Sequence, residues 1–295
     1  MISRELAQKI RYIQLSARRA VENVFSGEYA SVFRGHGVEF HDVREYYPGD
    51  EIRTIDWNVT ARTGRPQVKR FVEERELTLV FIVDVSASGS FGSVQKSKTE
   101  VAAELTALLS FAAIRHNDRV GLLAFTDHVE LFIPPKKGTT HALRLVRELL
   151  YFQPRQVRTD LSSALAYLRR VLHKRATVFL VSDFRADGYE HALRSVASRH
   201  DLIAVTVTDP AERQLPRAGL LDLEDAETGQ TVTVDTGSRR ARRAYAAAAA
   251  EWEAHLAQTL RRAGVDRIEL STGGDWTRNL ITFFRARERR GARAA

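Results

Sequence analysis

The chain has 295 residues, of which 44% are hydrophobic, and a formal net charge of +8 from 45 basic and 37 acidic side chains. This length suits one sizeable core with an accessory segment, or two small domains. The absence of cysteine excludes disulfides and thiolate metal sites. No segment approaches the roughly 18 consecutive apolar residues of a membrane-spanning helix, and the charged N-terminal segment lacks the apolar region of a signal peptide. We therefore expect a cytoplasmic protein without a membrane span.

The first part of the chain predicts a helix followed by a small β-rich segment. Apolar residues from Leu6 to Val24 recur every three or four positions, which is typical of an amphipathic helix. Residues 27–67 are rich in Gly, His and aromatic side chains and predict short strands and loops, with turns at 47–50 and 64–66. Trp57 and Tyr46 are expected to pack this segment against the sheet, beside a buried or semi-buried ion-pair network of Arg44, Asp50, Arg53, Asp56 and Arg62. A zinc site is a weaker alternative, because no regular spacing joins its candidates, His36, His41, Asp42 and Asp50.

From residue 77 onward, strands and helices alternate. Apolar runs at 77–83, 119–125, 176–182, 202–208 and 267–271 predict strands, and 129–134 is expected to return beside 119–125 as a hairpin. Helices are predicted around 101–112, 142–149, 164–172, 238–263 and 277–290, the first with a capping box at Ser97 and Glu100. The Thr228-Gly229 turn predicts an inserted hairpin at about 219–236. This alternation predicts an α/β fold with a doubly wound, mainly parallel sheet.

Three predicted strands end in oxygen-bearing side chains. The first ends in Asp84, Ser86 and Ser88, whose alternation on an extended chain would turn them the same way. Another delivers Asp183, and the loop before the helix at 164–172 presents Thr159 and Asp160. Ligands of open α/β sheets collect beyond the carboxyl ends of the strands. Carboxylates and hydroxyls there suit Mg²⁺, or else Mn²⁺ or Ca²⁺, and we predict a metal site of Asp84, Ser86, Ser88, Thr159 and Asp183.

Other interpretations of these residues remain open. Asp84 and the serines could cap the following helix, Thr159 or Asp160 the next one, and Asp183 the helix near Tyr189. A serine hydrolase is less favoured, because the segment at 88–92 lacks the first glycine of the G-x-S-x-G turn. An aspartate-based phosphoryl transferase would need a second Asp where Ser86 stands.

The same residues carry a resemblance to a known family. Asp84-x-Ser86-x-Ser88, Thr159 and Asp183 resemble the metal-ion-dependent adhesion site (MIDAS) of von Willebrand factor A domains. The resemblance implies that the hydroxyls contact the ion, that the aspartates act mostly through water, and that one position stays open for a partner's carboxylate. Residues 37–62 further resemble the bacterial family of the domain of unknown function 58, commonly encoded beside MoxR-type AAA+ ATPases. The departure lies at Gly89, where that family more often has methionine.

These observations lead to one expectation for domains and function. Residues 1–75 would form the N-terminal helix and β-rich segment, residues 76–290 a von Willebrand factor A-like, Rossmann-type domain, and residues 291–295 a tail. No catalytic acid and base, nucleophile with histidine, or phosphate loop can be assembled, so we do not expect an enzyme. We expect a Mg²⁺-dependent protein-interaction module that binds an Asp or Glu of a partner. The resemblance implies a MoxR-type ATPase as that partner, in chaperone-like assembly or regulation; a metal-dependent hydrolase using the same site is the alternative.

The excess positive charge lies near the C-terminal end. Residues 238–295 hold 13 Arg and six Asp or Glu, which leaves a net charge of only +1 for residues 1–237. Arginine clusters at 239–243 and 285–293 could meet phosphate or an acidic partner. A solvated helix face explains them better, since no zinc-finger spacing or basic patch interleaved with aromatics accompanies them. Nucleic acid is therefore not expected as the main partner.

Overall fold

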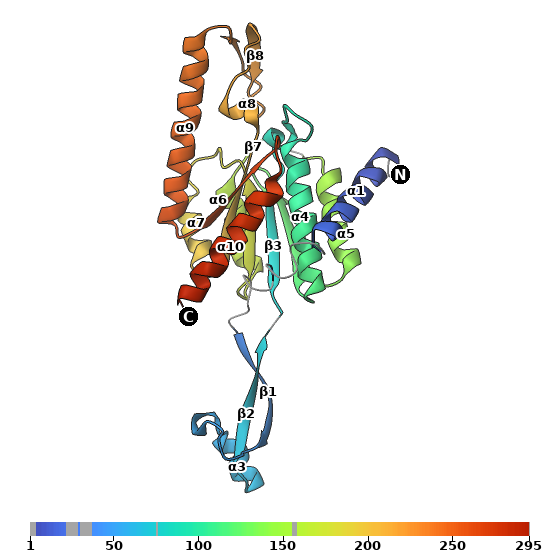
Figure 1. Cartoon of the computed structure of the whole chain (residues 1–295), viewed down its shortest axis with the longest axis vertical. Coiled ribbons are helices and arrows are strands. Elements are labelled where there is room, and N and C mark those ends of the chain that lie inside the picture. Colours follow the sequence, from blue (N-terminus) through green and yellow to red (C-terminus); the bar gives the residue numbers. More distant parts are fainter. Residues whose placement is uncertain (1–3, 22–28, 30–36, 75, 155–157, 295) are drawn as a thin grey trace. The chain divides into compact units, whose positions relative to one another are not determined.

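The computed structural model describes residues 4–21, 29, 37–74, 76–154 and 158–294 (Figure 1). Val24 and His36, which entered the predictions above, lie outside these residues. The chain divides into two compact units, one formed by Met1–Val32 with Leu77–Ala295 and the other by Phe33–Glu76. Within the described residues, no helix is both long and apolar enough to cross a membrane.

The larger unit is built on a six-stranded sheet with the order β10-β7-β6-β3-β4-β5. Five strands run parallel, and β5 pairs with β4 in the antiparallel direction. The strands are β3 (Thr78–Asp84), β4 (Arg119–Phe125), β5 (Val129–Lys136), β6 (Thr177–Ser182), β7 (Asp201–Thr208) and β10 (Asp266–Ser271). The predicted mainly parallel α/β sheet is therefore confirmed.

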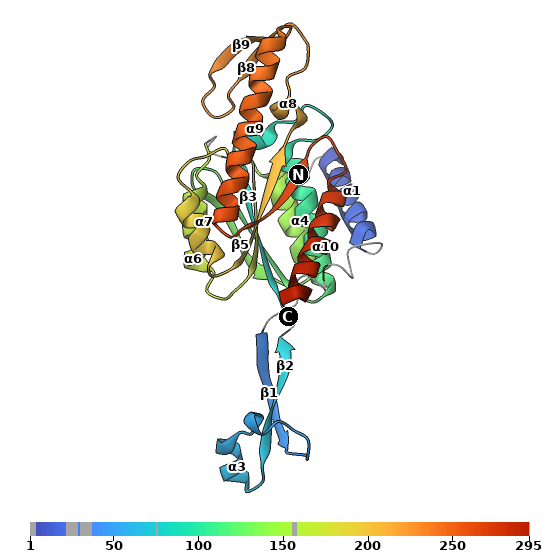
Figure 2. The same ribbon diagram turned by 60° about the vertical axis from the view of Figure 1, so that its left-hand side comes forward.

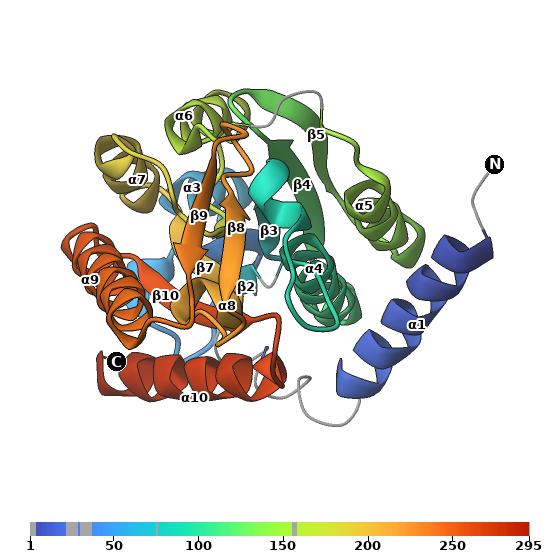
Figure 3. The same cartoon turned by 90° about the horizontal axis from the view of Figure 1, so that it is seen from above.

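Helices cover both faces of this sheet, which explains why the strands are apolar at successive positions and not at alternating ones. One face packs against α6 (Leu161–Val171), α7 (Glu190–Ala197) and α9 (Arg239–Arg262). On the other side lie α1 (Arg4–Ala20), α4 (Lys98–Arg115), α5 (Thr139–Tyr151) and α10 (Trp276–Ala294) (Figure 3). The predicted capping box is present, since Ser97 and Glu100 exchange hydrogen bonds at the start of α4.

The chain order creates a switch point between β3 and β6. From β3 the chain continues to β4 and β5 on one side, and then returns to β6 on the other side of β3. Such reversals open a crevice beyond the carboxyl ends of the two strands. Asp84 closes β3, and Asp183 directly follows β6. Two of the predicted site residues therefore flank the switch point.

A hairpin is inserted at the same end of the sheet. It consists of β8 (Leu220–Glu224) and β9 (Thr231–Asp235), which pair only with each other, and it follows the short helix α8 (Pro210–Arg213). In two views the hairpin lies beyond the end of the sheet toward which β3 points (Figures 1 and 2). Both strands lie within the range of about 219–236 that was predicted for the hairpin.

The smaller unit contains β1 (Gly37–Glu45) and β2 (Gln67–Glu74), which form an antiparallel pair, with η2 (Ile52–Thr54) and α3 (Trp57–Thr63) between them. The helix α3 was not predicted; it forms because Asp56 accepts hydrogen bonds from the amides of Asn58 and Val59 at its start. Arg44 and Asp50 make the expected ion pair at 2.7 Å, which occupies the carboxylate assigned to the zinc alternative. Trp57 is 65% exposed.

Part of the C-terminal positive charge is neutralised within the fold. Arg287 of α10 pairs with Asp201, and Arg290 lies 2.9 Å from Asp266. Arg285 of the same cluster also takes part in an interaction. These ion pairs agree with a structural role for this part of the basic segment.

Candidate functional site

The turn after β3 brings the two predicted serines together. Ser86 retains extended geometry, but residues Ala87–Ser90 form a short 3₁₀ helix, η3. The hydroxyl oxygens of Ser86 and Ser88 lie 3.2 Å apart. The prediction that strand alternation aligns Ser88 is therefore wrong, because the chain has already turned; the 3₁₀ turn brings the two hydroxyls together instead.

The two aspartates are buried behind these hydroxyls. One carboxylate oxygen of Asp84 accepts from the Ser86 amide at 3.0 Å, and the other accepts from the Ser182 hydroxyl at 2.7 Å. Asp183 accepts from the Arg185 amide at 3.2 Å. Burial, and then the charge of Asp183, raise the pKa of Asp84 to about 6.

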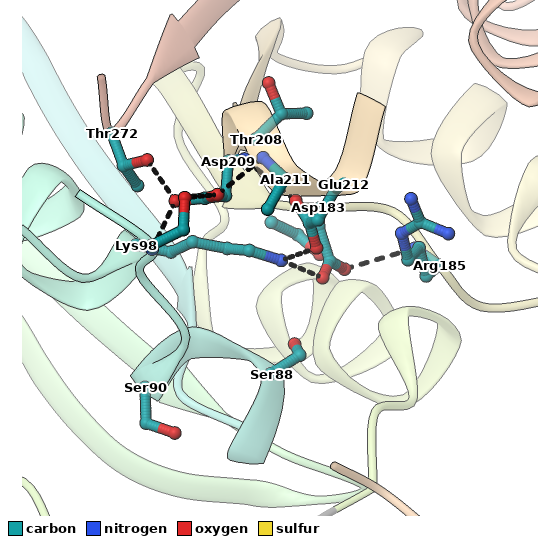
Figure 4. Close-up of polar contacts among 12 residues, drawn as sticks. Ser88, Ser90, Lys98, Asp183, Arg185, Thr208, Asp209, Ala211, Glu212 and Thr272 are labelled. Atoms are coloured by element: carbon teal, nitrogen blue, oxygen red, sulfur yellow. Dashed lines mark hydrogen bonds and ion pairs between the residues drawn. The ribbon is translucent and has the colours of Figure 1, made fainter. Parts of the chain in front are cut away.

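A buried lysine, which was not predicted from the sequence, completes this group. The ammonium of Lys98 lies 2.9 Å from a carboxylate oxygen of Asp183 and 2.5 Å from one of Glu212 (Figure 4). Burial alone would raise the pKa of Asp183 and lower that of Lys98, but their mutual attraction reverses both directions. Lys98 stands in the first turn of α4, where the helix dipole disfavours positive charge. The two carboxylates offset that cost.

Thr159 reaches the same edge of the sheet from the loop before α6. The amide of Asp160 donates to the backbone oxygen of Thr126, which follows β4. The Asp160 side chain caps α6 through the Ser163 amide at 3.1 Å, as one alternative predicted. The Thr159 hydroxyl donates instead to a carboxylate oxygen of Glu227, at 2.8 Å. Glu227 belongs to the inserted hairpin and was also missed.

The other capping alternatives fail. Helix α4 is capped by Ser97, so Asp84 and the serines after it do not cap that helix. Helix α7 has Tyr189 at its N-cap position and no side-chain cap, so Asp183 does not cap it. Ser90 is exposed, but its hydroxyl donates its proton to the backbone oxygen of Ala87 at 2.7 Å, whereas the nucleophile of a hydrolase turn donates to a catalytic base.

The donor set fits a small, hard cation. A cavity of about 20 Å³, room for one water molecule or an ion, lies between Asp84, Ser88, Lys98 and Asp183. Neighbouring ligands of an octahedral Mg²⁺ ion at about 2.1 Å are separated by about 3 Å, close to the 3.2 Å between the two serine hydroxyls. Asp84, Asp183 and Glu212 together carry three negative charges against the single positive charge of Lys98, so a further cation would be stabilised there.

Gly89 keeps this turn close to α4. A Cβ atom at this position would lie 2.7 Å from the Thr99 hydroxyl. The methionine that the resembled family more often has there would therefore require the Thr99 side chain or the turn to shift. Glycine permits the close approach of η3 to the first turn of the helix.

The raised pKa of Asp84 makes stability depend on pH when divalent cations are removed. Because the folded state holds this proton more tightly than the unfolded state, the contribution is present at low pH and is lost as pH rises through about 6. Between pH about 4.5 and about 7, the wild type should lose about 2 kcal/mol relative to Asp84→Asn, which has no proton to release. Urea unfolding in EDTA measures this difference. An equal difference between the two proteins at both pH values would contradict it.

Comparison with known proteins places the chain among uncharacterised relatives. The family model described as "Protein of unknown function DUF58" matches residues 42–255. Uncharacterized protein Rv1480 of Mycobacterium tuberculosis is 33% identical over 295 residues, covering 98% of this chain and 92% of the relative. Uncharacterized protein MAV169 of Mycobacterium avium is 35% identical over 167 residues, covering 55% of this chain and 96% of the relative.

Solved structures also resemble the chain. The structure of an aerotolerance-related membrane protein from Bacteroides fragilis aligns with a TM-score of 0.49 at 17% identity, covering 72% of this chain and 99% of that chain. The family match and the mycobacterial relative cover most of the sequence, the site residues included. The chain therefore belongs to the DUF58 family of proteins of unknown function.

Proposed function

We propose that this chain is a Mg²⁺-dependent protein-interaction module of the von Willebrand factor A type. The ion would be held by the hydroxyls of Ser86, Ser88 and Thr159, with Asp84 and Asp183 behind them as carboxylates that act mostly through water. Mn²⁺ or Ca²⁺ would suit the same oxygen donors. An Asp or Glu of a partner would bind at the open coordination position.

One observation carries this proposal. At the switch point of the sheet, two serine hydroxyls lie 3.2 Å apart in front of two buried carboxylates, in a group with an excess of negative charge. Among the described residues, no three or more His, Asp or Glu side chains form a metal-binding group. Catalytic metals usually have such carboxylate or imidazole ligands. The hydroxyl-rich arrangement therefore favours binding over hydrolysis.

For the partner we propose a MoxR-type AAA+ ATPase, with a chaperone-like role in assembly or regulation. The sequence resemblance of residues 37–62 and of the site supports this choice. A divalent cation with an open coordination position would bind an exposed carboxylate of the partner.

The test is Mg²⁺-dependent binding to the MoxR-type ATPase of the same genome. We expect binding in Mg²⁺ that is lost in EDTA and weakened at least about tenfold by Ser86→Ala, which removes one hydroxyl and no charge. Ser90→Ala is the matched control, because this hydroxyl lies on the same turn and bonds to the backbone of Ala87. Biolayer interferometry measures all four conditions.

Two results would contradict the proposal. Binding that is equal in Mg²⁺, in EDTA and in Ser86→Ala would show that the interaction does not depend on the metal. Phosphatase or nuclease turnover that disappears in Asp84→Ala would show instead that the site is catalytic. Circular dichroism of each variant separates these results from loss of folding.

A further inference from the structure

The inserted hairpin delivers a carboxylate to the predicted metal site. Glu227 lies in the turn between β8 and β9 and accepts the hydrogen bond from the Thr159 hydroxyl at 2.8 Å. It is half-buried, whereas the other turn residues, 225, 226 and 228–230, are exposed. Seen from above, the hairpin lies over the sheet with its turn near α6 (Figure 3). Of the turn residues, Glu227 is therefore the one directed into the domain.

The turn that carries Glu227 is preformed. One carboxylate oxygen of Asp225 accepts from the amides of Glu227 at 2.8 Å and Thr228 at 3.0 Å. The amide of Gly229 donates to the backbone oxygen of Asp225 at 2.7 Å, and Gly229 has φ of +69°, which favours glycine. Little conformational entropy is therefore lost when Glu227 is presented to the site.

The remainder of the hairpin is attached at its base and lies largely in solvent. The hydroxyl of Thr236 donates to the backbone oxygen of Gly219 at 2.7 Å and accepts from the Ala218 amide at 3.0 Å. Leu220 and Val232 are 73% and 60% exposed. A two-stranded hairpin is only marginally stable by itself. It can therefore leave the site at its tip while its base remains anchored.

The charges explain why such a contact would depend on a cation. Glu227 and Asp183 interact electrostatically, and two ionised carboxylates repel each other. The Thr159 hydroxyl keeps lone pairs after donating its proton to Glu227. It could bind an ion and hold Glu227 at the same time. A bound divalent cation would turn the repulsion between Glu227 and the acidic site into attraction.

We infer that Glu227 is an internal ligand of the metal site, which occupies the position that the partner's carboxylate would take. The hairpin thus acts as a displaceable inhibitor, and a partner must compete with Glu227 for the ion. This inference rests on the proposed function, because it needs both the ion and a carboxylate-bearing partner.

The test compares Glu227→Gln with the matched control Glu224→Gln. The first substitution keeps the size of the side chain and an acceptor for Thr159, but it removes the charge. Glu224 is an exposed carboxylate of the same hairpin. We expect Glu227→Gln to weaken Mg²⁺ binding, measured by titration calorimetry, by about tenfold, and to strengthen binding of the MoxR-type ATPase at saturating Mg²⁺ by about tenfold. Glu224→Gln should match the wild type in both measurements.

The possible failures are distinguishable. The wild type could bind Mg²⁺ and the ATPase while Glu227→Gln and Glu224→Gln have the same affinities in both measurements. In that case Glu227 is not an internal ligand, and the proposed function stands. If Glu227→Gln weakens ATPase binding instead, the hairpin is part of the partner's binding surface and does not inhibit. If the wild type binds no Mg²⁺, both the proposed function and the internal ligand are wrong.

Discussion

Replacing Lys98 by methionine is expected to lower the free energy of unfolding by about 3–5 kcal/mol when divalent cations are absent. The lysine is 4% exposed, and its ammonium pairs with Asp183 and Glu212 at 2.9 and 2.5 Å. Methionine fills a similar volume but leaves both carboxylates without their cation. Urea unfolding of the wild type and the variant in EDTA measures the loss.

The same experiment in Mg²⁺ links this loss to the site. A divalent cation near Asp183 should recover part of the stability of Lys98→Met, because it replaces the missing positive charge. Lys96→Met is the matched control: Lys96 pairs with Glu104 but is 36% exposed, so we expect a loss below about 1 kcal/mol. A loss for Lys98→Met as small as that of the control would contradict the buried ion pair.

Asp209→Asn should cost about 2–4 kcal/mol near neutral pH, because an amide group replaces an acceptor among four donors. Asp209 follows β7 and is fully buried. It accepts from the amides of Ser93 and Ala211, both at 2.8 Å, and from the hydroxyls of Thr272, at 2.5 Å, and Ser93. These bonds tie the loop before α4, which leads to Lys98, to the ends of β7 and β10.

The pH dependence of this effect has a definite sign. Burial would raise the pKa of Asp209, but the hydrogen bonds from Ser93 and Thr272 bring it below its ordinary value. The stabilisation is therefore present above the ordinary pKa of an unfolded aspartate and is lost as pH falls through the lower, folded value. This stabilisation is measured by comparing the thermal unfolding of Asp209→Asn with that of the exposed control Asp275→Asn. Equal melting temperatures for the two variants near neutral pH would contradict the prediction.

The strands could be predicted from the sequence because their signals are local. The apolar run that forms β3, the Ser97 capping box of α4 and the Thr228-Gly229 turn of the hairpin each lie within a few residues, and all three are present. Because ligands of open α/β sheets collect beyond the carboxyl ends of the strands, Asp84 and Asp183 could also be predicted to lie at one site. By contrast, α3 was not predicted, because its N-cap residue, Asp56, stands in a segment whose residues are typical of turns.

The remaining members of the site could not be predicted because long-range contacts bring them there. Lys98 lies 85 residues from Asp183 and 114 from Glu212, and Glu227 lies 68 residues from Thr159. A lysine beside a capping serine is typical of a solvated helix start, and a glutamate in a polar turn is typical of an exposed loop. One local signal was available: Asp209 and Glu212 form a capping box, which marks a helix start directly after β7.

The central claim is that the hydroxyls beyond β3 hold a divalent cation. A crystal structure of the protein soaked in Mn²⁺, with anomalous data collected at the manganese edge, tests it most directly. We predict an anomalous peak within about 2.5 Å of the hydroxyl oxygens of Ser86 and Ser88, which is strongly reduced in Ser86→Ala crystals soaked in the same way. Well-ordered wild-type crystals with no peak at these hydroxyls, and with Lys98 as the only cation beside Asp183, would contradict it.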